Sequence, residues 1–134
     1  MADLQSINAI LEEQELEEQG KVGDGSRVVL IGRDLRDLDF RGADFRNADL
    51  RDSNISGSNM GGVDLRGANL TGAVMLNVDF RNALLSYADF SEADLRGSDL
   101  TGASLDGTEM WRTNLKGCRI SPEILHEMLS CRKP

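Results

Sequence analysis

Cysteine, proline, histidine and aromatic residues are scarce in this sequence. Its 134 residues include two cysteines, two prolines, one histidine and one tryptophan, and aromatic residues account for 4%. Two cysteines are too few for the disulfide framework of a small secreted domain. No apolar run approaches the ~20 residues of a membrane-spanning helix, and the first residues lack the basic start and apolar stretch of a signal peptide. We therefore expect a cytoplasmic protein, or a component of a virion or similar assembly, with no membrane partner and no secretion by a signal peptide.

Basic side chains are outnumbered by acidic ones, and the excess is unevenly spread. The formal net charge is −8. Residues 1–20 contain six acidic residues and no lysine or arginine, whereas the stretch from Arg33 to Pro122 contains 14 acidic and 11 basic residues. Because nucleic-acid-binding domains carry a basic patch or stripe, direct binding to nucleic acid is not expected.

A five-residue repeat runs through most of the chain. Every fifth residue from Leu30 to Ile120 is large and apolar, and the residue two places before it is small or apolar after Arg33. A five-residue step scatters side chains around an α-helix and alternates faces along a strand. Neither element explains the pattern, so we expect a short extended piece followed by a corner in every repeat.

The corner is marked by residues that adopt turn conformations at little cost. Glycine or asparagine often lies two places after the large residue, as at Gly42, Asn47, Gly57 and Gly62. If each corner turns the chain by about a right angle, four repeats complete one coil, and the chain advances by one strand spacing of ~4.8 Å.

Several repeats resemble the A(D/N)LXX motif of the pentapeptide-repeat proteins. The segments Ala43-Asp44-Phe45-Arg46-Asn47, Ala68-Asn69-Leu70-Thr71-Gly72 and Ala93-Asp94-Leu95-Arg96-Gly97 carry the resemblance, which extends from Val28 to about Pro122. The resemblance implies an all-β solenoid, namely a right-handed, four-sided β-helix with the large and small residues inside.

The interior of such a narrow tube is expected to consist of the large central residues. Burial of each should contribute about 1.5–3 kcal/mol. The predicted structural core is Phe40, Phe45, Leu50, Leu65, Leu70, Phe80, Leu85, Phe90, Leu95 and Leu100.

Short α-helices are expected at both ends of the solenoid. The predicted organisation is an acidic amphipathic helix over 1–20, a linker over 21–27, the β-helix over 28–120, and a capping helix and tail over 121–134. Ser121-Pro122-Glu123 is typical of a helix start, with serine as the N-cap and proline in the first turn. The N-terminal helix either folds back over the outward Val29 and Ile31 or binds another chain.

The sequence offers no catalytic, metal-binding or cofactor-binding constellation. The sole histidine, His126, has no partner nearby in sequence, and Cys118 falls in a small inward position, which favours packing over redox chemistry. The carboxylates alternate with arginines, and a filled tube leaves no cleft for a substrate. We therefore expect a protein that is not an enzyme and needs no cofactor.

Outward apolar residues are the best candidates for an interface, since paired apolar groups on a surface indicate contact. Within the repeats they are Val29, Ile31, Val74, Leu76, Leu84, Tyr87 and Trp111. The apolar stripes of the terminal helices add Leu4, Ile7, Leu11, Leu125, Met128 and Leu129.

Three functions are compatible with this pattern. The favoured one is a structural, protein-interaction module that binds a protein partner or associates with itself as a homo-oligomer. The resemblance implies a second, because some pentapeptide-repeat proteins mimic DNA and bind a type II topoisomerase such as gyrase, although the mild acidity of the repeats disfavours this role. The third is a component of a larger particle, such as a phage or secretion assembly, anchored by residues 1–20.

Overall fold

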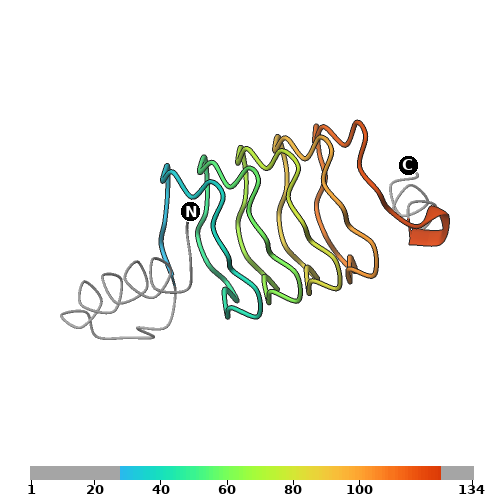
Figure 1. The fold of residues 1–134 in the computed structure, drawn as a ribbon, viewed down its shortest axis with the longest axis horizontal. Helices are drawn as coiled ribbons and strands as arrows, with labels where there is room; N and C mark the ends of the chain where they lie inside the picture. Colours follow the sequence, from blue (N-terminus) through green and yellow to red (C-terminus); the bar gives the residue numbers. More distant parts are fainter. Residues whose placement is uncertain (1–27, 125–134) are drawn as a thin grey trace.

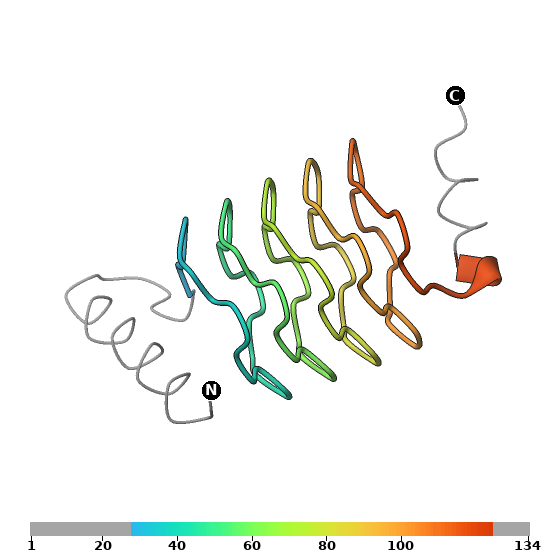
Figure 2. The same ribbon diagram turned by 45° about the horizontal axis from the view of Figure 1, so that its top comes forward.

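The chain rises in stacked coils of 20 residues. A computed structural model describes residues 28–124, and Figures 1 and 2 show its coils lying side by side along one axis. Each bridge is parallel and joins a residue to the one 20 positions later, as in Asp44 to Asp64 and Asp64 to Leu84. Four pentapeptides therefore make one coil, as the repeat predicts.

Each stack of pentapeptides forms what we call a wall, named here by its central residues. Wall 1 is centred on Leu30, Leu50, Leu70, Phe90 and Met110, wall 2 on Leu35, Ile55, Met75, Leu95 and Leu115, wall 3 on Phe40, Met60, Phe80, Leu100 and Ile120, and wall 4 on Phe45, Leu65, Leu85 and Leu105. The corner after wall 4 leads to wall 1 of the next coil.

Hydrogen bonds between coils replace the ladders of an ordinary sheet. The N–H of Leu65 donates to the carbonyl of Leu84 at 2.8 Å, and the N–H of Asp64 donates to the carbonyl of Ala43 at 3.0 Å. The next turn closes where the N–H of Ala68 donates to the carbonyl of Leu65 at 3.0 Å. Each extended piece is thus a single bridging residue between turns, shorter than a conventional strand.

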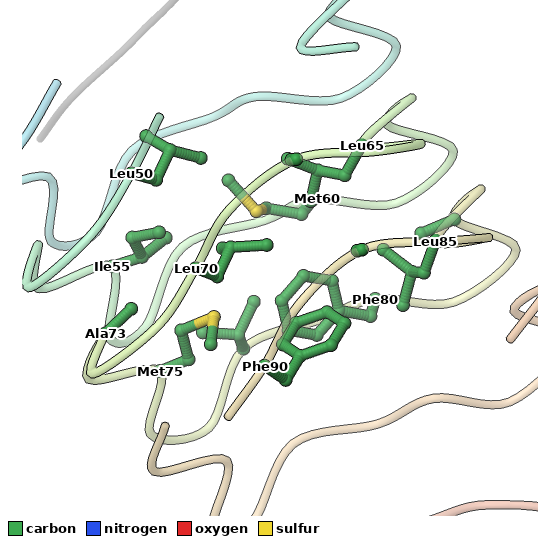
Figure 3. Close-up of a cluster of buried hydrophobic side chains, with 14 of the residues drawn as sticks. Leu50, Ile55, Met60, Leu65, Leu70, Ala73, Met75, Phe80, Leu85 and Phe90 are labelled. Carbon is green, nitrogen blue, oxygen red and sulfur yellow. The ribbon is translucent and has the colours of Figure 1, made fainter. Parts of the chain in front are cut away.

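Large side chains fill the inside of the coils. The ten residues predicted as core each have 2% or less of their surface exposed, and Figure 3 shows several of them stacked between consecutive coils. Buried serines also lie inside, and their hydroxyls are satisfied: Ser53 donates to the carbonyl of Leu50 at 2.7 Å, and Ser58 to that of Leu35 at 2.7 Å. Among residues 28–124, no buried side-chain nitrogen or oxygen lacks a hydrogen-bond partner.

A helix begins directly after the last coil and occupies residues 122–124 of the described chain. The N–H of Ile124 donates to the hydroxyl of Ser121 at 3.3 Å, as an N-cap serine requires. Within 28–124, no helix is long and apolar enough to cross a membrane.

Several predictions lie outside the described residues and stay predictions. They concern the helix over 1–20, the linker over 21–27 and the end of the chain from residue 125. The interface candidates among them are Leu4, Ile7, Leu11, Leu125, Met128 and Leu129.

Candidate functional site

The corner residues adopt a left-handed backbone conformation throughout. Most of them are glycine, asparagine or aspartate, which tolerate a positive φ. Three others stand out, namely Tyr87, Glu92 and Arg112, with φ of 65°, 61° and 59°. A bulky tyrosine in this conformation is a genuine outlier, and such outliers cluster at functional sites. Tyr87 is therefore the strongest candidate for a functional residue among the corners.

The ring of Tyr87 lies over Gly107, the corner one coil further on. A Cβ added at Gly107 would lie 2.5 Å from each of two ring carbons of Tyr87. The backbone of Tyr87 is held as well, because its N–H donates to the carbonyl of Asp106 at 2.8 Å. Although this support fixes the base of the side chain, 73% of Tyr87 remains exposed.

The same relation recurs at other corners: a side chain in one coil occupies the space that a glycine leaves in the next. It holds for Asp37 over Gly57, Asn47 over Gly67, Asp52 over Gly72, Asn77 over Gly97 and Asn82 over Gly102. This pairing was not among the predictions from the sequence, in which each corner is considered by itself. A comparison of corners 20 residues apart would have found it.

Leu84 lies on wall 4 in the same pentapeptide as Tyr87, and we call these two residues the Tyr87 patch. Leu84 is 37% exposed, and it bridges Asp64 in the coil before and Ser104 in the coil after. Polar residues thus occupy the equivalent position on both sides. Two predicted interface residues are therefore exposed within a single pentapeptide.

Trp111 forms a second exposed aromatic position, on wall 1 in the last coil. It is 54% exposed, and the guanidinium carbon of Arg112 lies 4.5 Å from the centre of a Trp111 ring. Such a cation–π contact contributes ~0.5–1 kcal/mol at an exposed site. Arg112 also breaks the pattern of corner pairs. In the pairs described above, the corner one coil after a non-glycine residue is a glycine, but the corner one coil after Glu92 is Arg112.

The remaining candidates within the repeats differ in exposure. Val74 and Leu76, on wall 2, are half-buried, and Val74 bridges Asn54 and Asp94. Val29 is also half-buried, whereas Ile31 is 45% exposed. The side chains of the Tyr87 patch are thus more exposed than those of Val74 and Leu76.

Aspartate and arginine form regular pairs on the outer surface. The guanidinium two residues after each paired aspartate holds both of its carboxylate oxygens, as in Arg36 with Asp34 and Arg41 with Asp39. These hydrogen bonds lower the pKa of Asp34 and of Asp39 to about 2. The pairs lie mainly within single pentapeptides, and one further contact, Arg46 Nε to Asp64 Oδ2 at 3.9 Å, reaches the next coil.

The described residues offer little for metal or thiol chemistry. No group of three or more histidine, cysteine, aspartate or glutamate side chains within 28–124 could hold a metal ion. The thiol of Cys118 donates to the carbonyl of Leu95 at 2.8 Å, and burial raises its pKa. A protonated, hydrogen-bonded thiol is a poor nucleophile.

Comparison with known proteins identifies the repeat. A family model described as "Pentapeptide repeats", in 8 copies, matches residues 26–62, 48–86, 64–102 and 83–121. No curated protein matches the sequence.

Two crystal structures are similar to this chain in fold and sequence. One is HetL, a pentapeptide-repeat protein involved in heterocyst differentiation regulation in the cyanobacterium Nostoc sp. strain PCC 7120, at 26% identity and a TM-score of 0.67. The alignment covers 68% of this chain and 44% of HetL, so the chain matches less than half of that protein. The other is AT2G44920, a pentapeptide-repeat protein from the thylakoid lumen of Arabidopsis thaliana, at 25% identity and a TM-score of 0.69. That alignment covers 86% of this chain and 85% of AT2G44920.

Proposed function

This chain belongs to the pentapeptide-repeat family, and on that premise we propose that it is a non-catalytic protein-interaction module that binds its partner through the Tyr87 patch. The coils are filled by apolar side chains, which leaves the outer surface for function. The right-handed, four-sided β-helix is part of the same proposal, and the 20-residue step between bridged residues supports it.

The observation that carries the proposal is the conformation of Tyr87. Its φ of 65° suits glycine, asparagine or aspartate, which occupy most of the equivalent corners. Tyrosine at this corner costs stability, and its ring gains little from burial because 73% of the residue is exposed. A residue that lowers stability and presents an aromatic ring to solvent is explained by contact with a partner.

Leu84 extends the same surface. Aromatic residues at the centre of an interface supply much of the binding energy, and neighbouring apolar groups exclude water around them. Because the Tyr87 ring rests on Gly107, it is held in place before binding, which lowers the entropy lost on association.

Two matched variants test the proposal. The patch variant combines Leu84→Ser, after Ser104 in the next coil, with Tyr87→Asn, after Asn47 at the equivalent corner. The control combines Val74→Asn with Leu76→Ser and so reproduces Asn54 and Ser56 on wall 2. Both variants remove two apolar side chains and introduce residues that this fold already accepts at those positions.

The tagged parent and both variants are purified from the natural host, and proteins that copurify are quantified by mass spectrometry. Light scattering of each purified chain measures self-association. We expect a specific partner, or a second copy of the chain, to be lost from the patch variant and retained by the control. If the parent and the patch variant associate with the same proteins to the same extent, the proposal is wrong.

Tyr87→Asn also checks the argument from conformation. Asparagine tolerates a positive φ better than tyrosine does, so this substitution should raise the free energy of unfolding by about 0.5–1 kcal/mol. A loss of stability on this substitution would show that Tyr87 serves the fold, and would remove the main support for the proposed function.

A further inference from the structure

Four acidic residues close in sequence to Tyr87 or Gly107 share with Asp37, Asp52 and Asp99 the lack of an ion pair within residues 28–124. Asp89, Glu92 and Glu109 lie on wall 1, and Asp106 lies on wall 4 just before the Gly107 corner. None of these four carboxylates forms an ion pair among residues 28–124, whereas seven other aspartates pair with the arginine two residues on.

Two of these carboxylates are direct neighbours. Asp89 and Glu109 are joined by a parallel bridge, so their side chains start about one strand spacing apart, at ~4.8 Å, on the same face. Like charges directly opposite each other destabilise a sheet. A cation supplied from outside the chain would relieve this repulsion.

The nearest basic side chain of wall 1 in these two coils is Arg112, which is already engaged. Residues 88–92 and 108–112 contain three acidic side chains, those of Asp89, Glu92 and Glu109, and one basic side chain. The guanidinium of Arg112 stacks on Trp111 at 4.5 Å. The outer surface on the two sides of the Tyr87 corner therefore combines the exposed Leu84 and Tyr87, from wall 4, with net negative charge on wall 1.

From this combination we propose that the Tyr87 patch binds a basic segment of a partner protein, in which lysine or arginine side chains flank an apolar one. The apolar side chain packs on Leu84 and Tyr87. The cations pair with Asp89 and Glu109, and a cation over the Tyr87 ring adds a cation–π contact. This inference rests on the proposed function and adds the chemistry of the partner.

Three short, fluorescein-labelled peptides of equal length probe the chemistry directly. One alternates arginine with leucine, one alternates glutamate with leucine, and one alternates arginine with serine. Fluorescence anisotropy at low and high salt measures their binding to the full chain. We expect the arginine–leucine peptide to bind most tightly and to weaken as salt rises, and the glutamate–leucine peptide not to bind.

Charge variants test which carboxylates attract the basic peptide. Asp89→Asn with Glu109→Gln should weaken binding of the arginine–leucine peptide about fivefold and reduce its salt dependence. The control, Asp37→Asn with Asp99→Asn, changes the net charge equally at two aspartates away from the patch that form no ion pair within the described chain. Binding to the control should match the parent.

The outcomes separate this inference from the proposed function. If Leu84→Ser with Tyr87→Asn abolishes peptide binding but the Asp89 and Glu109 variant binds normally, the patch is an apolar docking site without charge selection. That result overturns the inference and leaves the proposed function standing. Equal binding of the glutamate–leucine peptide, or no binding of any peptide, also overturns the inference. So does sedimentation that shows patch-dependent self-association in place of peptide binding, because the occupant is then a second copy of this chain.

Discussion

The aromatic ring of Tyr87 rests on Gly107, one coil further along the chain. The two ring carbons nearest to Gly107 would lie 2.5 Å from an added Cβ, and both residues have a positive φ, 65° and 69°. The pair thus joins the proposed binding surface to the coil that supports it, and it can be tested by substitution.

Gly107→Ala should destabilise the protein more than Gly62→Ala. Both glycines have similar φ, +69° and +67°, but a Cβ at Gly62 would meet nothing within 4 Å. We expect Gly62→Ala to cost about 1 kcal/mol for the left-handed backbone alone, and Gly107→Ala about 1 kcal/mol more for the contact with the ring. Urea unfolding measures both. In a Tyr87→Gly background the difference should vanish, and a difference that persists would contradict the contact.

Phe80→Ala should cost about 3–5 kcal/mol of unfolding free energy. Phe80 is fully buried, and its ring meets that of Phe90 edge to face, with centroids 6.3 Å apart and planes at 83°. The control is Leu84→Ser, which removes an exposed side chain and should change stability by about 0.5 kcal/mol or less. Similar urea midpoints for the two variants would show that the inside of the coils does not hold the fold together.

The ionisation of Asp34 should depend on Arg36. Its pKa is lowered to about 2, first by the hydrogen bond from the Arg36 side chain, so in Arg36→Gln the pKa should rise towards the ordinary value of about 3.9. Because the pKa of Asp34 is lower in the folded chain than in the unfolded one, the pair favours folding above about pH 4, and this contribution is lost as the pH falls towards 2. An NMR titration of the Asp34 carboxyl in both proteins checks the shift. Identical titration midpoints would be incompatible with the pairing.

The thiol of Cys118 should react slowly in the folded protein. Burial raises its pKa, and its hydrogen bond to the carbonyl of Leu95 keeps the proton in place, so little thiolate is present at neutral pH. With Cys131→Ser, Cys118 is the sole thiol, and its labelling by a chromogenic disulfide reagent can be followed in buffer and in urea. We expect rapid labelling only on unfolding. Equally fast labelling in buffer would mark Cys118 as a reactive thiol.

The DNA-mimic alternative stays a prediction, and we expect it to fail in a gyrase supercoiling assay. Wall 3 pairs Asp39 with Arg41 and Asp79 with Arg81, so much of its negative charge is neutralised, unlike the phosphate backbone of DNA. The purified chain should leave supercoiling unchanged at every concentration. Inhibition that rises with concentration would revive the alternative. The particle component anchored by residues 1–20 also stays a prediction, because its anchor lies outside the described residues.

The candidate site was only partly predictable. The five-residue period marked Leu84, Tyr87, Val74 and Leu76 as outward, but it could not rank them. Wall 2 leaves its two apolar residues half-buried, whereas Leu84 and Tyr87 are exposed. This ranking depends on the side chains of adjacent coils, which lie 20 residues away in the sequence.

The sequence by itself determined the repeat, the inward and outward positions and the family, because a strict period of large, small and turn residues leaves one way to bury the apolar side chains. The tertiary structure alone decided which outward apolar side chains are the most exposed, which arginine also reaches a carboxylate in the next coil, and how Gly107 supports Tyr87. These properties arise between coils and at corners, where contact depends on the stacking of distant residues, and periodicity along one chain carries no information on exposure or distance across the stack.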